Sequence, residues 1–323
     1  METPSSSTPS SRCRIAFKAA GISLGVALIA WLLAQLWPVQ VTVPGRNPWR
    51  PAAKARPLII AHGGGQGLHP ANTLPAFEHS AASGCDAIEF DLRLTRDGVL
   101  VTHHDASIDR LSDGTGLVID QTMQELKSKN FGAKFSDPAG QKTYQTTPAR
   151  LATLEELFQR FTNLPMVIEL KDKGADGTRA ATSLADLIRR YRMEPRVMVA
   201  SFDDPTLEAF RHASGHSVST SAAVGETRNL VILSRLGLDR LASPKSQGLQ
   251  IPVAKYGYAL DFPRLVHSAH QRNMAIHYWT INDPAEMQRL IRLGADGLIT
   301  DRPDIMRETL RRLGYPEIET PER

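Results

Sequence analysis

The sequence predicts an α/β fold, a TIM-type (β/α)8 barrel with an insertion, preceded by one N-terminal transmembrane helix. From Pro57 onward, strand-like runs alternate with helical runs over about 260 residues, which is the length and order typical of such a barrel. The whole chain has 323 residues, of which 41% are hydrophobic and 22% charged, as in ordinary globular proteins. A doubly wound sheet is the alternative, but no Gly-x-Gly-x-x-Gly run precedes a helix.

Hydrophobic periodicity and turn residues place the elements along the chain. Strands are expected at 58–62, 87–94, 99–104, 166–171, 197–202, 218–223, 248–252, 275–281 and 297–300. Helices are expected at 73–83, 153–162, 182–192, 205–213, 226–236, 261–273, 284–293 and 304–313.

Nine expected strands are one too many for an eight-stranded barrel. The link Arg96-Asp97-Gly98 is too short for a parallel crossover, and Asp-Gly is a hairpin turn signal. We therefore expect a local hairpin between the second and third strands. Residues 106–150 are mostly polar, which indicates an insertion on the catalytic rim of the barrel.

The N-terminal part of the sequence predicts a membrane anchor. Residues 1–18 form a disordered basic N-terminus, and 19–37 carry no charge over a length that nearly spans a bilayer. The basic flank predicts a single-pass protein of the cell membrane, with its N-terminus inside and the catalytic domain outside the cytoplasm. Secretion after cleavage of a signal peptide is the alternative. A proline-rich, semi-rigid linker (38–56), the barrel (57–315) and a short tail (316–323) follow.

The charge distribution gives no support for nucleic-acid binding. The net charge is +4, but residues 1–56 hold seven basic side chains and one acidic one. Of the 38 basic and 34 acidic residues of the chain, 31 and 33 therefore remain in 57–323, a net charge of −2. The two cysteines, Cys13 and Cys85, lie on either side of the apolar segment and form no disulfide framework.

Acidic and basic side chains stand at the ends of two expected strands. Glu89 and Asp91 are two residues apart, so their side chains point to one face. Two carboxylates forced together favour a cation between them, and oxygen ligands suit Mg²⁺ or Ca²⁺. Glu169 and Lys171 share a face in the same way, with Glu169 a candidate third ligand and Lys171 able to contact a bound phosphate. Surface acids and an internal ion pair are the structural alternatives.

Histidines at strand ends are the candidates for proton transfer. His62 enters a triple-glycine turn, which brings backbone N–H groups close to an anionic ligand, and His104 precedes Asp105. Trp279 ends a late expected strand, where its side chain would either form a wall of the substrate site or pack in the core. Further predictions of the same kind are His69 and His277 as rim residues, Asn72 as a helix N-cap, and Asp301 as the partner of a neighbour or a cap of the last helix.

These motifs, taken in order, resemble those of the glycerophosphodiester phosphodiesterase family. They are His62-Gly63-Gly64, Pro70-Ala71-Asn72-Thr73, Glu89-Phe90-Asp91, His104-Asp105, Glu169-Leu170-Lys171, Trp279-Thr280-Ile281-Asn282 and Thr300-Asp301. The resemblance covers about 57–313. Gly63 replaces an arginine of the family pattern and Ala71 replaces a glutamate, which leaves substrate preference open.

The resemblance implies a metal-dependent barrel that hydrolyses glycerophosphodiesters to glycerol 3-phosphate and an alcohol. It implies that His62 and His104 are the acid/base pair, that Glu89, Asp91 and Glu169 bind the metal, and that Lys171 and Trp279 contact substrate. Two alternatives stand beside it. One is a lysophospholipase D or sphingomyelinase D-like lipid phosphodiesterase, and the other is a non-catalytic phosphate-binding barrel. The oligomeric state is not predicted.

Overall fold

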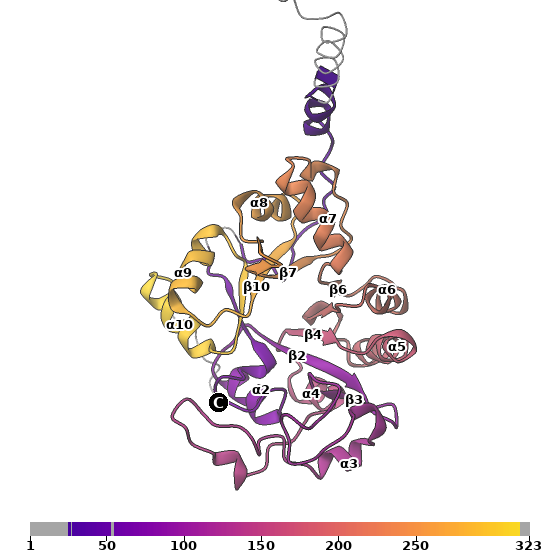
Figure 1. Cartoon of the computed structure of the whole chain (residues 1–323), viewed down its shortest axis with the longest axis vertical. Helices are drawn as coiled ribbons and strands as arrows, with labels where there is room; N and C mark the ends of the chain where they lie inside the picture. The colour runs from indigo at the N-terminus through magenta and orange to yellow at the C-terminus, as the bar shows by residue number, and fades with distance from the viewer. Residues whose placement is uncertain (1–24, 27, 53–54, 317–323) are drawn as a thin grey trace, which may run out of the picture.

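Eight parallel strands form the barrel of this protein (Figure 1). The computed structural model describes residues 25–26, 28–52 and 55–316. The barrel strands are β1 (Leu58–Ala61), β2 (Ala87–Leu94), β4 (Met166–Leu170), β5 (Val197–Ala200), β6 (Ser219–Thr220), β7 (Gly248–Pro252), β10 (Ala275–Trp279) and β11 (Gly297–Thr300). Every one overlaps an expected strand, and the TIM-type barrel is confirmed.

The strand order is β6-β5-β4-β2-β1-β11-β10-β7, which is the cyclic order of a barrel opened between β6 and β7. A parallel bridge between Ser221 and Gly248 joins these two edges, so the barrel is nearly closed. The ninth strand, β3 (Leu100–Thr102), pairs with β2 antiparallel, with Leu92 opposite Thr102. The expected hairpin at Asp97-Gly98 is confirmed.

Helices cover the outside of the barrel. They are α2 (Leu74–Ala82), α4 (Leu154–Arg160), α5 (Gly174–Tyr191), α6 (Asp204–Ala213), α7 (Val224–Arg235), α8 (Pro263–Gln271), α9 (Pro284–Leu293) and α10 (Pro303–Arg312). The prediction that α5 starts at 182 is wrong, because the helix already begins at Gly174. Gly174 and Gly177 lower the helix propensity of its first turns, so the sequence did not indicate them as helical. A Cβ on Gly177 would meet Thr206 Oγ1 at 2.3 Å, so glycine is what permits the close α5–α6 contact.

Residues 106–150 form a layer of their own beyond β3 rather than a wall of the barrel. They contain the short helices η2 (Val118–Asp120), α3 (Met123–Lys127) and η3 (Thr143–Gln145). Helix α3, which the sequence reading missed, begins in a capping box in which Thr122 and Glu125 bond each other's backbone. Ile108, Val118 and Leu126 belong to a small core that also takes in Val101 of β3. The segment is thus anchored to the barrel through the β2–β3 hairpin.

Trp49 closes the amino end of the barrel. Its side chain is buried among interior residues of the strands, including Ile60, Val167 and Met198. The segment before it crosses the end of the barrel, where Asn47 Nδ2 donates to the carbonyls of Gln247 and Asn273. Part of the expected linker therefore packs as barrel core.

The N-terminal helix touches the domain next to the end of α7. Residues 25–26 and 28–35 are helical, and most of their apolar side chains are exposed. Trp31 Nε1 donates to Leu236 O at 3.3 Å, and Gln35 Nε2 donates to Gly237 O at 2.7 Å. Within the described residues, no helix combines the length and the hydropathy required to cross a membrane. Residues 19–24 and 27 of the expected span, the whole of 1–18, and 317–323 lie outside the described residues, so the anchor stays a prediction.

Candidate active site

Because side chains alternate along each strand, polar side chains of β2 and β4 point into the barrel near its carboxyl end. On β2, Phe90 packs outward in the hydrophobic core, while Glu89 and Asp91 point inward above Ala87. On β4 and the residue after it, Glu169 and Lys171 follow Val167 on the same inner face. Mainly apolar side chains thus fill the amino end of the barrel, and charged ones line its carboxyl end, where active sites of this architecture lie.

Three carboxylates converge at this end. One oxygen each of Glu89, Asp91 and Glu169 can be chosen so that all three lie within 4.8 Å of one another. Lys171 Nζ lies 3.1 Å from Asp91 Oδ1 and 2.7 Å from Glu169 Oε1. Gly63 N–H donates to Glu89 Oε2 at 3.0 Å. The acids therefore belong to an interior cluster, and the surface-acid alternative is wrong.

The electrostatics of the cluster favour a bound cation. Burial, followed by the charge of Asp91, raises the pKa of Glu89 to about 7. Burial also raises the pKa of Glu169, although Lys171 opposes that shift. Carboxyls pushed toward neutrality in this way gain from a positive ion among them, since it stabilises their charged forms. An all-oxygen donor set fits a hard divalent ion such as Mg²⁺ or Ca²⁺, and Glu89, Asp91 and Glu169 are the residues that would hold it.

Asn72 positions one of these ligands instead of capping a helix. Its Nδ2 donates to Asp91 Oδ2 at 2.9 Å, and its Oδ1 accepts from Asp91 N at 3.1 Å. The N-cap of α2 is Thr73, so the prediction for Asn72 is wrong. Asn72 adopts a positive φ of 58°, which asparagine tolerates better than most residues. The side chain therefore fixes the orientation of Asp91 across the barrel.

His62 is held by a network from the last strand. Its Nδ1 lies 2.6 Å from Asp301 Oδ1, while its Nε2 lies 4.0 Å from Glu89 Oε2. Gln66 Nε2 and Asn282 Nδ2 both donate to the Asp301 carboxylate, which fixes its position. Burial alone would lower the pKa of His62, but the hydrogen bond to Asp301 and the nearby carboxylates raise it to about 9. The sequence offered Asp301 two roles, and the structure assigns it the first, as the partner of a neighbour.

His104 faces the same cavity and is more exposed. Its Nδ1 lies 2.7 Å from Asp105 Oδ1, and Arg110 Nε donates to the other oxygen of Asp105. The hydrogen bond from Arg110 lowers the pKa of Asp105, so this carboxylate stays charged beside the ring. The His104 carbonyl accepts from Arg93 Nε. Both histidines thus pair Nδ1 with a carboxylate, which fixes the ring and leaves Nε2 for chemistry.

Two other histidines lie away from the centre. His277 is fully buried at the amino end of the barrel, where its Nε2 bonds Trp49 O, so its prediction as a rim residue is wrong. His69 bonds the Tyr144 hydroxyl at 2.6 Å and stacks near His79, outside the cavity.

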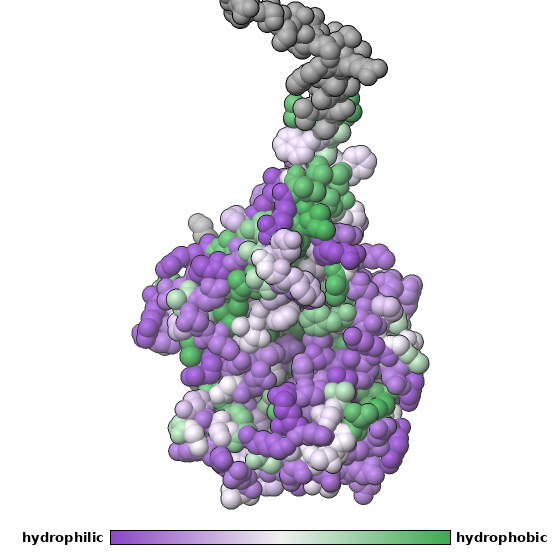
Figure 2. Space-filling model, viewed as in Figure 1, coloured by the Kyte–Doolittle hydropathy of each residue, from purple (hydrophilic) through white to green (hydrophobic). Residues whose placement is uncertain are grey.

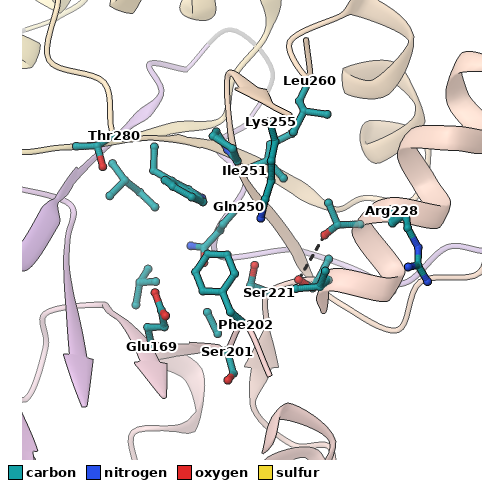
Figure 3. A pocket seen from close by; sticks show the side chains of 18 of the residues that line it. Glu169, Ser201, Phe202, Ser221, Arg228, Gln250, Ile251, Lys255, Leu260 and Thr280 are labelled. Carbon is teal, nitrogen blue, oxygen red and sulfur yellow. Dashed lines mark hydrogen bonds between the residues drawn. The ribbon is translucent and has the colours of Figure 1, made fainter. Parts of the chain in front are cut away.

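A cavity of about 850 Å³ contains the acidic cluster and extends well beyond it. Trp279 and Phe202 form part of its wall, with ring centroids 5.9 Å apart, so the substrate-wall position of Trp279 is supported over core packing. Figure 3 shows Glu169 and Phe202 on one side of the cavity, Lys255, Ile251 and Leu260 on another, and Arg228 at its edge. Sequence reasoning missed this outer wall, which comes from α7 and from the hairpin of β8 (Ala254–Lys255) and β9 (Tyr258–Ala259).

The known proteins that resemble this chain include several glycerophosphodiester phosphodiesterases. The model of the glycerophosphoryl diester phosphodiesterase family matches residues 62–305. A glycerophosphodiester phosphodiesterase from Caldanaerobacter subterraneus is 29% identical over 80% of this chain and 99% of its own length. A glycerophosphodiester phosphodiesterase from Bacillus altitudinis is 30% identical over 76% of this chain and 95% of its own length.

More distant proteins extend the comparison. The mouse lysophospholipase D GDPD3 is 25% identical over 80% of this chain and 84% of its own. An Oleispira antarctica phosphodiesterase, solved with the product sn-glycerol-3-phosphate, shares the fold with a TM-score of 0.65 at 21% identity. That match covers 79% of this chain and 97% of the other.

Proposed function

The chain belongs to the glycerophosphoryl diester phosphodiesterase family, and on that premise we propose that it hydrolyses glycerophosphodiesters to glycerol 3-phosphate and an alcohol. It is thus a phosphoric diester hydrolase. The observation that carries the proposal is the convergence of Glu89, Asp91 and Glu169 with Lys171 and His62 at the carboxyl end of the barrel. The product named in the Oleispira structure is consistent with this chemistry.

The residues of the site divide the work between charge and proton transfer. A divalent ion held by the three carboxylates would neutralise phosphate oxygens and increase the electrophilicity of phosphorus. Lys171 would contact a further phosphate oxygen as a fixed positive charge. His62 and His104 would carry the two proton transfers, one removing a proton from the attacking hydroxyl and the other protonating the departing alcohol. Asp301 and Asp105 keep each ring in the required orientation.

Hydrolysis of glycerophosphocholine by the purified chain tests the proposal. We expect release of glycerol 3-phosphate and choline that EDTA abolishes and Mg²⁺ or Ca²⁺ restores. The variant Glu169→Gln should lose roughly a hundredfold or more in kcat/KM, because a neutral amide oxygen replaces a charged ligand of the ion. Glu194→Gln is the matched control, since Glu194 lies before β5 at the opposite end of the barrel. Full activity in EDTA, or equal activity of the two variants, would refute the metal-dependent mechanism.

We also propose that residues 19–37 anchor the chain in the cell membrane with the barrel outside the cytoplasm. The uncharged run and its basic flank support the anchor. Trp31 and Gln35, in the later part of this run, hydrogen-bond to the domain, so the barrel lies directly next to the end of the proposed anchor. Retention of the chain in membranes after alkaline extraction, together with protease sensitivity of the barrel in whole cells, tests the anchor and its orientation. Release of the chain by alkaline extraction would contradict it.

A further inference from the structure

The hydrolysis of a small soluble diester does not require the outer part of the cavity. Beyond the acidic cluster it runs along α7, where it is lined by Val224, Thr227, Val231, Ile232 and the stem of Arg235. A helix of this length, Val224–Arg235, extends over about 18 Å. The opposite wall consists of Pro252, Tyr256, Tyr258 and Leu260 from β7 and the β8–β9 hairpin. A single continuous hollow thus joins the catalytic carboxylates to the far end of α7.

The chemistry of this outer wall is apolar with a basic edge. Ile232 is 49% exposed, Val224 41% and Tyr258 68%, although all three line a concave surface. Such side chains, left open to water inside a hollow, indicate an apolar ligand. The acids among the described lining residues are Glu89, Asp91 and Glu169, all at the inner end. Lys255 and Arg228 stand at the outer part, so this part presents positive charge and no negative charge to the phosphate of an amphiphile.

The far end of this hollow lies beside the N-terminal helix. Arg235 ends α7, and the next two residues, Leu236 and Gly237, accept the hydrogen bonds of Trp31 and Gln35. Figure 2 shows apolar surface on the α7–α8 end of the domain, from which the N-terminal helix rises. Leu236 and Leu241, both exposed, belong to this end. The hollow therefore leads from the catalytic centre toward the segment that we propose to be the membrane anchor.

We propose that the hollow along α7 binds the acyl chain of a single-chain lipid phosphodiester, whose phosphate reaches the carboxylate cluster. The inference rests on the proposed function and specifies its substrate class. In the reaction, water supplies a hydroxyl that bonds to phosphorus, and the bond from phosphorus to the head-group oxygen breaks. The head group leaves as an alcohol with the remaining proton, and an acylglycerol phosphate stays on the enzyme. The polar insertion 106–150 is not involved, because none of its residues lines the cavity.

The experiment compares glycerophosphocholine with lysophosphatidylcholines of increasing acyl length, all below micelle-forming concentrations. The full chain is used in lipid nanodiscs with the metal supplied, and choline release is measured. Each methylene that enters the hollow should raise kcat/KM up to about fourfold until the hollow is filled. Ile232→Glu should lower the ratio of lysolipid to glycerophosphocholine kcat/KM roughly tenfold, because it places a charge against the chain.

Two further variants make the comparison specific. Leu241→Glu adds the same charge to an exposed leucine at the same end of the domain but outside the cavity, and should retain both activities. Ile232→Ala should give a smaller loss in the same ratio, which guards against a folding defect of the glutamate variant.

The possible outcomes separate failure of the acyl-chain site from failure of the proposed function. Rates that do not depend on acyl length, or equal ratios for Ile232→Glu and Leu241→Glu, would overturn the acyl-chain site and leave the proposed function intact. Turnover of neither substrate by the wild-type chain would refute the proposed function, and the acyl-chain site that rests on it.

Discussion

Replacing Trp49 by alanine should destabilise the barrel strongly without touching its chemistry. A buried tryptophan removes about 150–250 Å² from water, worth about 4–6 kcal/mol at about 25 cal/mol per Å². Its indole N–H, however, has no hydrogen-bond partner among the described residues, and such a donor costs about 1–3 kcal/mol. We therefore expect Trp49→Ala to lower the free energy of unfolding by about 3–5 kcal/mol. Trp49→Phe, which deletes the unpaired donor and keeps most of the area, should lose less than half of that.

Thermal unfolding followed by circular dichroism measures this difference, with the full chain in one fixed mild detergent. About 2 °C is lost per kcal/mol in a domain of this size, so Trp49→Ala should unfold roughly 6–10 °C below wild type. A midpoint within about 2 °C of wild type would mean that the Trp49 side chain contributes little to the core. The same reasoning predicts that a fragment starting at Pro57 is less stable than one starting at Thr42, whose N–H bonds Arg272 O.

Three further predictions concern the site and the pH dependence. Asp301→Asn should lower kcat by about a hundredfold, as His62 loses its charged partner, with KM little changed in steady-state kinetics. Asn72→Ala should weaken metal binding about 10- to 100-fold in a calorimetric titration, because Asp91 loses both bonds to this side chain. Burial lowers the pKa of His277 in the native state, so on acidification the unfolded chain takes up a proton first. The free energy of unfolding should therefore fall as the pH drops below about 6.5, by up to about 1.4 kcal/mol per pH unit, and less steeply in His277→Gln.

Each of these has a result that would count against it. A kcat of Asp301→Asn equal to wild type would separate Asp301 from proton transfer. Unchanged metal affinity in Asn72→Ala would show that Asp91 keeps its orientation without help. The same slope of stability against pH in His277→Gln and wild type would mean that other groups, such as the buried His103, account for the dependence.

The inner site was predictable because strand periodicity determines which side chains share a face. Glu89 and Asp91 needed only an alternating strand to be placed together, and Glu169 and Lys171 needed only a second one. The partner of His62 was harder, since Asp301 lies 239 positions away and only barrel closure brings β11 beside β1. Its position after the last strand was the available signal.

The outer cavity was not predictable from the same patterns. The apolar face of α7 looks like any amphipathic helix face, which normally packs inward. In the structure, Ile232 and its neighbours instead line a hollow that the β8–β9 hairpin also borders. Trp49 was hidden for the opposite reason, because it lies in a proline-rich segment whose composition indicates a linker. Asn72 was misassigned because a helix follows it directly, as it follows many N-caps.

Metal dependence is tested by titrating Mn²⁺, a spectroscopically visible divalent ion, into the metal-free chain while measuring glycerophosphocholine hydrolysis. We expect one tightly bound ion per chain, much weaker binding of that ion by Glu169→Gln, and activity that rises in proportion to occupancy. Hydrolysis by the chain without a bound ion, or an ion bound equally well by Glu169→Gln, would contradict it.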